Sequence, residues 1–180
     1  MKILQFLLIS LSHKILKILP YRLIRLLSVP IGTLYFLLTF RSSIKLFKRR
    51  KIFEKLKINY KPLIVKINYT RYWLETLWLT NKNFSKHITP HVEIENQEYV
   101  DKLKKQYPGL IFALPHLGNW EFAIPIGNSI KLNLLAVAEP LSNSYVLNWF
   151  KTLRESLGIE IIIGGKGQNT FELLVNKLKS

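Results

Sequence analysis

The amino-acid sequence predicts an α/β fold: a mostly parallel sheet with helices on its faces, preceded by a helical N-terminal segment. In the second half of the chain, short apolar runs of strand length alternate with segments of helical periodicity. Such alternation is typical of strands that are joined by crossover helices and pair in parallel. The first 60 residues instead have a mainly helical pattern, and the 180-residue chain is long enough to bury one core.

The N-terminal third of the chain carries nearly all of the excess positive charge. The sequence holds 27 Lys and Arg against 11 Asp and Glu, a net charge of +16. Up to Arg71 there are 16 basic residues and one acid, Glu54, so this part alone carries +15. A basic segment of this kind favours a polyanionic partner, which is either nucleic acid or an anionic lipid surface.

Apolar residues within residues 1–40 favour the lipid surface. Residues 3–13 and 26–40 are uncharged, but each run is shorter than the roughly 18–20 residues of a bilayer span. Aliphatic residues at spacings of three and four predict a helix that lies in the membrane interface. This stripe consists of Leu4, Leu8, Leu11, Ile15, Leu19 and Leu23. The alternative is an amphipathic helix packed on its own domain. The basic cluster at 41–57 lies among apolar residues without a nucleic-acid-binding signature, so we predict no nucleic-acid partner.

The elements that precede the alternating region are helices and one edge strand. Residues 69–79 form an aromatic-rich helical pattern, residues 91–94 alternate like an edge strand, and residues 98–106 predict a short helix. Pro108 and Gly109 end that helix.

From residue 110 onward, strands and helices are predicted in turn. The strands are 110–114, 133–138 and 159–163, and the helices are 119–129, 143–157 and a last one from about 170. Gly158 is placed to stop the helix before it. Asn169 and Glu172 resemble a capping box for the last helix.

The segment Leu-Pro-His-Leu-Gly-Asn-Trp-Glu at 114–121 follows the first predicted strand. Open α/β sheets bind ligands outside the carboxyl ends of their strands. His116 could take a proton from an attacking hydroxyl while the Glu121 carboxylate holds the imidazole tautomer. The alternative is a loop histidine bonded to the backbone, with Glu121 supporting a helix start. The tight turn that Gly118 and Asn119 permit favours a site.

Other kinds of chemistry are excluded or weakly indicated. The chain has no cysteine, so disulfides and thiol catalysis are excluded. It has no Gly-x-Ser-x-Gly motif, and the glycine-rich turn at 164–167 lacks a Walker ending. Pro90 between His87 and His91 disfavours a helical zinc pair. We therefore predict no metal and no cofactor.

Residues 115–121 resemble the His-x4-Asp/Glu motif of bacterial glycolipid acyltransferases in the lysophospholipid acyltransferase superfamily. This group contains the late acyltransferases of lipid A synthesis and the phosphatidylinositol mannoside acyltransferases. Three further stretches are similar to the second branch: Tyr-Thr-Arg-Tyr-Trp-Leu-Glu at 69–75, Val-Ala-Glu-Pro-Leu at 137–141 and Arg-Glu-Ser-Leu-Gly at 154–158. The mannoside branch usually has Asp where Glu121 stands, whereas the lipid A enzymes use Glu.

The resemblance implies a glycerolipid acyltransferase-like fold and a location. Residues 1–40 would be a membrane-interface helical segment, and residues 41–180 the N-terminal part of an acyltransferase α/β domain, since members of the family are typically longer. The expected location is the cytoplasmic face of the plasma (inner) membrane, peripheral or anchored by the N-terminus. The expected partners are an anionic membrane surface, a glycolipid acceptor and an acyl thioester donor.

The resemblance also implies an activity and its residues. A fatty acyl group would move from acyl-CoA or acyl carrier protein to a sugar hydroxyl of a phosphatidylinositol mannoside-type glycolipid, with His116 as general base and Glu121 holding it. Glu139 and Arg154 would lie beside this dyad as substrate-binding residues, where the Arg154 cation could position the acid or meet donor phosphates. From the chemistry alone we infer that Asn119 and the loop amides are candidates to stabilise the thioester oxyanion. One alternative is a late lipid A acyltransferase that takes lauroyl or myristoyl groups from acyl carrier protein. A second is a non-catalytic membrane-binding fragment.

Overall fold

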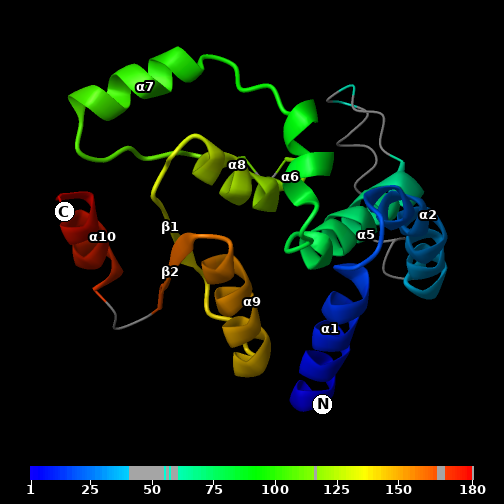
Figure 1. Cartoon of the computed structure of the whole chain (residues 1–180). Helices are drawn as coiled ribbons and strands as arrows, with labels where there is room; N and C mark the ends of the chain where they lie inside the picture. The colour runs from blue at the N-terminus through cyan, green and yellow to red at the C-terminus, as the bar shows by residue number, and fades with distance from the viewer. Residues whose placement is uncertain (41–54, 56, 58–60, 116, 166–168, 180) are drawn as a thin grey trace. The chain divides into compact units, whose positions relative to one another are not determined.

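The computed structural model describes residues 1–40, 55, 57, 61–115, 117–165 and 169–179, and these residues are mainly helical (Figure 1). The elements are α1 (Lys2–Leu16), α2 (Tyr21–Leu38), α5 (Pro62–Trp78), α6 (Phe84–His87), the 3-10 helix η1 (Thr89–His91), α7 (Gln97–Gln106), the 3-10 helix η2 (Trp120–Phe122), α8 (Ala123–Ser129), β1 (Leu134–Ala138), α9 (Ser144–Ser156), β2 (Ile159–Ile163) and α10 (Thr170–Lys179). The chain divides into two compact units. The helical unit is Ser12–Asn81, and the sheet unit is Met1–Leu11 together with Lys82–Ser180.

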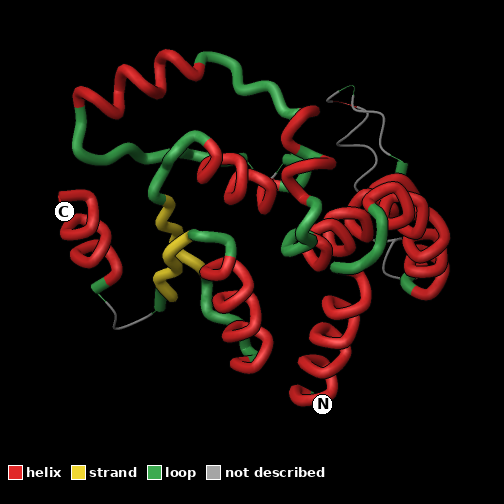
Figure 2. The backbone as a smooth tube through the Cα atoms, viewed as in Figure 1, coloured by secondary structure: helices red, strands yellow, loops and turns green. Residues whose placement is uncertain are grey.

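The sheet unit contains a parallel pair of strands joined by a helix. β1 and β2 pair with Leu134 opposite Ile159, and α9 is the connection between them (Figure 2). The core lies where α8 meets this sheet, and its buried members are Ile124, Ile159 and Ile161. The predicted parallel pairing is therefore confirmed, with β1, β2, α9, α10 and α7 all within two residues of their predicted bounds.

The end of α9 is fixed by Gly158, as its position predicts. Gly158 has φ +90° and donates its N–H to the Glu155 carbonyl at 3.0 Å. A Cβ at this position would lie 2.6 Å from the Asn128 side-chain nitrogen, which donates to the Leu157 carbonyl. Glycine is required here by both the left-handed backbone and the close approach. At the start of α10, Asn169 bonds the Glu172 side chain, so the two predicted capping residues do interact.

Two predicted strands are wrong. Residues 110–114 have no regular secondary structure, and Ile111 is 85% exposed. A strand requires a ladder partner for its backbone groups, and in the described part of the chain the sheet consists of β1 and β2. Residues 92–94 are also irregular, and His91, the first residue of the predicted edge strand, belongs instead to η1, whose first turn contains Pro90.

The predicted apolar stripe from Leu4 to Leu23 is divided between two helices. α1 ends at Leu16, and α2 begins only after Pro20, whose backbone is extended at φ −62° and ψ 142°. The proline ring disfavours helical geometry in the residue before it, so a single helix cannot run through this point. Helical structure itself is confirmed over α1 and α2, while most of the basic cluster at 41–57 falls outside the described residues.

Among the described residues, α2 is the helix whose length and apolar composition would allow it to cross a bilayer. Those two properties are the only observations in favour, and core helices and signal sequences share them. The prediction that residues 1–40 form a membrane-interface segment is not tested by the fold.

The start of α1 is held to the start of α9 within the sheet unit. The buried Asn143 side chain caps α9 by accepting the Tyr145 N–H at 3.2 Å. The same side chain donates to the Lys2 carbonyl at 2.9 Å and to Gln5 Oε1 at 3.0 Å. The Asn143 side chain thus pairs an N–H at the start of α9 that has no partner within the helix. It also attaches the start of α1, which is more than 130 residues away in the sequence.

The end of α1 belongs to the helical unit and is attached there by His13. The His13 Nδ1 lies 2.8 Å from the Leu77 carbonyl, so it carries the hydrogen, and Nε2 lies 3.4 Å from the Thr80 hydroxyl. Burial lowers the pKa of His13 below 6.5, with a further lowering from Lys17, although the bond to Leu77 acts in the opposite direction. The folded protein therefore favours the neutral imidazole.

We expect His13 to make the protein less stable in acid. Because its pKa is lower in the folded state, its contribution to stability is complete above pH 6.5 and is lost as the pH falls from 6.5 through the folded pKa. Thermal unfolding midpoints of the wild type and His13→Gln, measured between about pH 7.5 and about pH 5, check this. The wild-type midpoint should fall more steeply with acid than that of the variant. Parallel pH profiles would contradict the assignment.

Candidate functional site

Two residues predicted for the site, Glu121 and Arg154, form a bidentate ion pair in the sheet unit. Arg154 Nε donates to Glu121 Oε2 at 3.0 Å, and its terminal nitrogen donates to Glu121 Oε1 at 2.5 Å. The Glu121 residue is 2% exposed, and the Arg154 side chain is 24% exposed. Two parallel charge-assisted bonds fix a carboxylate in both position and orientation.

Local sequence places Glu121 at a helix start. Gly118 has φ +64°, a left-handed conformation that turns the chain. The Asn119 side-chain oxygen then accepts the Glu121 N–H at 3.2 Å, so Asn119 is the N-cap of η2. Phe122 packs edge-to-face on Phe84 at 5.4 Å between ring centroids, which anchors the turn from the other side. The short turn that carries the Glu121 carboxylate is therefore held by two contacts, the Asn119 cap and the packing of Phe122 on Phe84.

Arg154 reaches Glu121 from the last turn of α9. Its guanidinium carbon lies 5.5 Å from the centroid of the Phe150 ring, one helical turn earlier on the same face. This cation–aromatic contact adds an electrostatic attraction that helps to hold the guanidinium in place. The fold brings together two residues that are 33 positions apart in the sequence.

The other predicted site residues have different outcomes. His116 lies outside the described residues. Asn119 uses its side-chain oxygen as a helix cap, so any donation to an oxyanion would have to come from Nδ2. Glu139 is exposed directly after β1, and in the described part of the chain no hydrogen bond or ion pair joins it to Glu121 or Arg154.

Each oxygen of the Glu121 carboxylate accepts one hydrogen bond from Arg154. A carboxylate oxygen can accept about two hydrogen bonds in all, so a guanidinium partner does not by itself prevent a carboxylate from also accepting an imidazole N–H. His116 is five residues earlier in the sequence, and this pair could orient its ring as second-shell carboxylates orient catalytic histidines.

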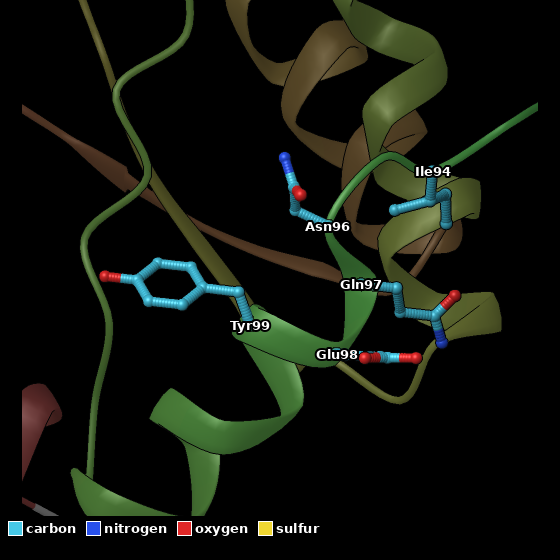
Figure 3. A pocket seen from close by; sticks show the side chains of 5 residues that line it. All are labelled: Ile94, Asn96, Gln97, Glu98 and Tyr99. Atoms are coloured by element: carbon cyan, nitrogen blue, oxygen red, sulfur yellow. The ribbon is translucent and has the colours of Figure 1, made fainter.

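A hollow in the sheet unit lies away from the predicted site residues. It is lined by side chains from one short stretch at the start of α7: Ile94, Asn96, Gln97, Glu98 and Tyr99 (Figure 3). Most of these residues are exposed, and none was predicted for the site. Over the described ranges, no group of three His, Asp or Glu side chains gathers to hold a metal ion.

Comparison with known proteins gives matches in sequence. The family model described as bacterial lipid A biosynthesis acyltransferase matches residues 2–180. The phosphatidylinositol mannoside acyltransferase of Mycobacterium tuberculosis (strain CDC 1551 / Oshkosh) is 30% identical over 116 residues, which are 63% of this chain and 36% of the relative. The protein of the same name from Mycolicibacterium smegmatis is 29% identical over 115 residues, 62% of this chain and 36% of that protein. The match thus spans about a third of the curated relatives. No solved structure matches significantly.

Proposed function

Because the chain belongs to the bacterial lipid A biosynthesis acyltransferase family, we propose that it carries the catalytic motif of an enzyme that acylates a sugar hydroxyl of a membrane glycolipid from a thioester donor. The observation that supports this most directly is the buried Glu121, which follows His116 by five residues and is held in a bidentate pair by Arg154. A fixed, charge-balanced carboxylate five residues from a histidine suits general-base catalysis on a hydroxyl, in which a carboxylate can orient the imidazole.

In the proposed reaction, the His116 imidazole removes the proton from the sugar hydroxyl as its oxygen attacks the thioester carbonyl. A C–O bond forms, the carbonyl oxygen becomes an oxyanion, and the C–S bond then breaks. The imidazolium returns its proton to the departing thiolate, so no acyl-enzyme forms. Glu121 orients the ring through its second N–H, and Arg154 keeps Glu121 in place. Backbone amides near Asn119, together with its Nδ2, are the candidate donors to the oxyanion.

The proposed acceptor is a phosphatidylinositol mannoside-type glycolipid, with acyl-CoA as donor. The support for it is the identity to two mycobacterial proteins of that name. A lipid A precursor with acyl carrier protein as donor is the second candidate, because the description of the matching family model names lipid A. Glu139 would contribute to substrate binding in either case, from its exposed position after β1.

The proposed location is the cytoplasmic face of the plasma (inner) membrane. The excess positive charge of the N-terminal third would hold the protein on anionic lipid, with residues 1–40 lying in the interface as a peripheral segment or anchor. The acceptor sugar and the soluble donor would then meet at this surface.

The test is acyl transfer by the purified chain with each donor and acceptor pair. We expect turnover of palmitoyl-CoA with a mannosylated phosphatidylinositol. Turnover only of acyl carrier protein with a lipid A precursor would assign the second candidate. If neither pair reacts, although circular dichroism and cooperative unfolding show a folded protein, the chain is a non-catalytic membrane-binding fragment and the proposal is wrong for it.

A further inference from the structure

The α2 helix is apolar on two opposite faces. Ile24, Ser28 and Gly32 recur every four residues and are buried. The small residues permit close packing on α5, since a Cβ at Gly32 would lie 2.6 Å from the Ile67 Cα. On the opposite face, Leu34 and Leu37 are 56% and 62% exposed. Packing on α5 accounts for the first face, whereas within the described residues the side chains of Leu34 and Leu37 stay largely exposed.

The first half of α5 also carries exposed apolar side chains. α5 packs against α2 with Lys66 and Tyr69 beside Tyr35: the Lys66 ammonium lies 4.2 Å from the Tyr35 ring centroid, and the Tyr35 and Tyr69 rings stack at 6.3 Å. Near this contact Ile64 is 46% exposed and Tyr69 49%. We define the outer α2–α5 surface as Leu26, Leu34, Leu37, Leu63, Ile64 and Tyr69.

The last turns of α5 are different, because they are buried and two of their polar side chains have partners inside the unit. Six consecutive positions from Leu74 to Leu79 are buried, in contrast to the first half of the helix. Glu75 accepts the Tyr21 hydroxyl at 3.0 Å, and the Trp78 indole donates to the Leu19 carbonyl at 2.8 Å. The helix pair therefore has a packed end and an end with an exposed apolar surface.

Aromatic rings lie between the two ends. Tyr69 stacks near Tyr72 at 6.5 Å and meets Trp73 edge-on at 6.2 Å, and Tyr72 meets Trp73 at 5.8 Å. Tyrosine and tryptophan, each with an apolar ring and a polar tip, concentrate at the level of lipid headgroups. The cluster with Lys66 has the composition of such an interfacial belt.

Charge identifies the occupant of the surface. Before Glu75 the sequence contains a single acid, Glu54, and Arg22 and Arg25 are exposed on α2 itself. An exposed apolar surface in a strongly basic part of the chain is complementary to an anionic bilayer, where acyl chains and phosphates are both within reach.

We propose that the outer α2–α5 surface inserts into the interface of an anionic bilayer, with Tyr69, Tyr72 and Trp73 at headgroup level. The lipid-binding surface thus extends beyond residues 1–40 to a helix that the sequence pattern did not include. The proposal rests on the proposed membrane location but not on acyl transfer. Binding is measured without turnover, so the two proposals can fail separately.

The first test compares two double variants of the full chain on vesicles of phosphatidylcholine with phosphatidylglycerol. Leu34→Asn with Ile64→Asn should weaken partitioning at least about tenfold, because two exposed aliphatic side chains lose their transfer free energy. The control, Ile111→Asn with Phe171→Asn, changes side chains of the sheet unit that are even more exposed, and it should alter binding less than about twofold. Equal effects, or wild-type binding by the first variant, would overturn the proposal.

The second test uses the four tryptophans as depth probes. Lipids brominated near the headgroup should quench the protein's fluorescence, and Trp73→Phe should remove most of that quenching while keeping an aromatic ring. Trp149→Phe, which changes α9, should leave the quenching in place. Quenching that survives Trp73→Phe would contradict the assigned depth. If the Leu34 and Ile64 variant instead dissociates an oligomer in lipid-free buffer and still binds vesicles, the surface joins copies of this chain and the proposal is wrong.

Discussion

Replacing His116 with alanine is expected to lower acyl transfer by about 10²–10⁴-fold, the usual contribution of a positioned general base. The sugar hydroxyl would then have to lose its proton to water during attack on the thioester. Because Glu121 is buried and held by Arg154, it cannot move out to act as a substitute base. The loss should appear in kcat with little change in the KM for either substrate, since the imidazole acts on the transition state.

The measurement is the initial rate of transfer at saturating donor and acceptor, with His87→Ala as the matched control. His87 is an exposed histidine near α6, so its removal should leave the rate unchanged. Unfolding midpoints of both variants should equal that of the wild type. Transfer by His116→Ala at the wild-type rate would remove the general-base assignment, whatever the identity of the acceptor.

The sequence predicted the local parts of the sheet unit well, because their causes are local. Alternating strands and helices require a parallel pairing, and β1 and β2 pair in that way. Gly158 stops α9 because its own backbone adopts a left-handed conformation. Residues 110–114 have the composition of a buried strand, yet a strand also requires a neighbour that composition does not supply. The predicted strand at 110–114 is wrong because these residues have no strand to pair with in the described part of the chain, although their composition favours a strand.

The helical unit shows the same limit. A pattern of leucines at spacings of three and four predicted one continuous helix, but Pro20 overrides it. The role of α5 could not be predicted from its aromatic content, because buried and exposed rings look alike in a sequence. Gly32 and Ser28 signal close helix packing only once α5 is known to be the partner.

At the candidate site, the sequence predicts the turn at Gly118 and Asn119, and the fold shows that Arg154 is the partner of Glu121. The left-handed Gly118 and the Asn119 cap are properties of neighbouring residues, and both were expected to shape this loop. The contact between Glu121 and Arg154 joins η2 to the last turn of α9, and the neighbours of each residue in the sequence do not determine it. The packing of Phe122 on Phe84 had no signal in the sequence.

The ion pair leads to the largest stability effect that the structure predicts. Arg154→Ala should destabilise the protein by about 3–5 kcal/mol, because it leaves a carboxylate that is 2% exposed without its countercharge. Arg154→Lys should recover only part of this, since an ammonium cannot form the two parallel bonds of a guanidinium. Chemical denaturation at neutral pH gives the free energy of unfolding of each variant.

A double variant separates the structural role of the pair from its chemical one. In Glu121→Leu with Arg154→Met neither charge is buried, and replacing a buried pair by apolar residues of similar size is often neutral or stabilising. Its unfolding free energy should therefore return to within about 1–2 kcal/mol of the wild type, while acyl transfer stays as low as in His116→Ala. Recovery of activity together with stability would show that the pair serves folding alone. A stable but inactive protein is what the proposed orientation of His116 by Glu121 requires, because the imidazole then lacks the acceptor that holds its tautomer.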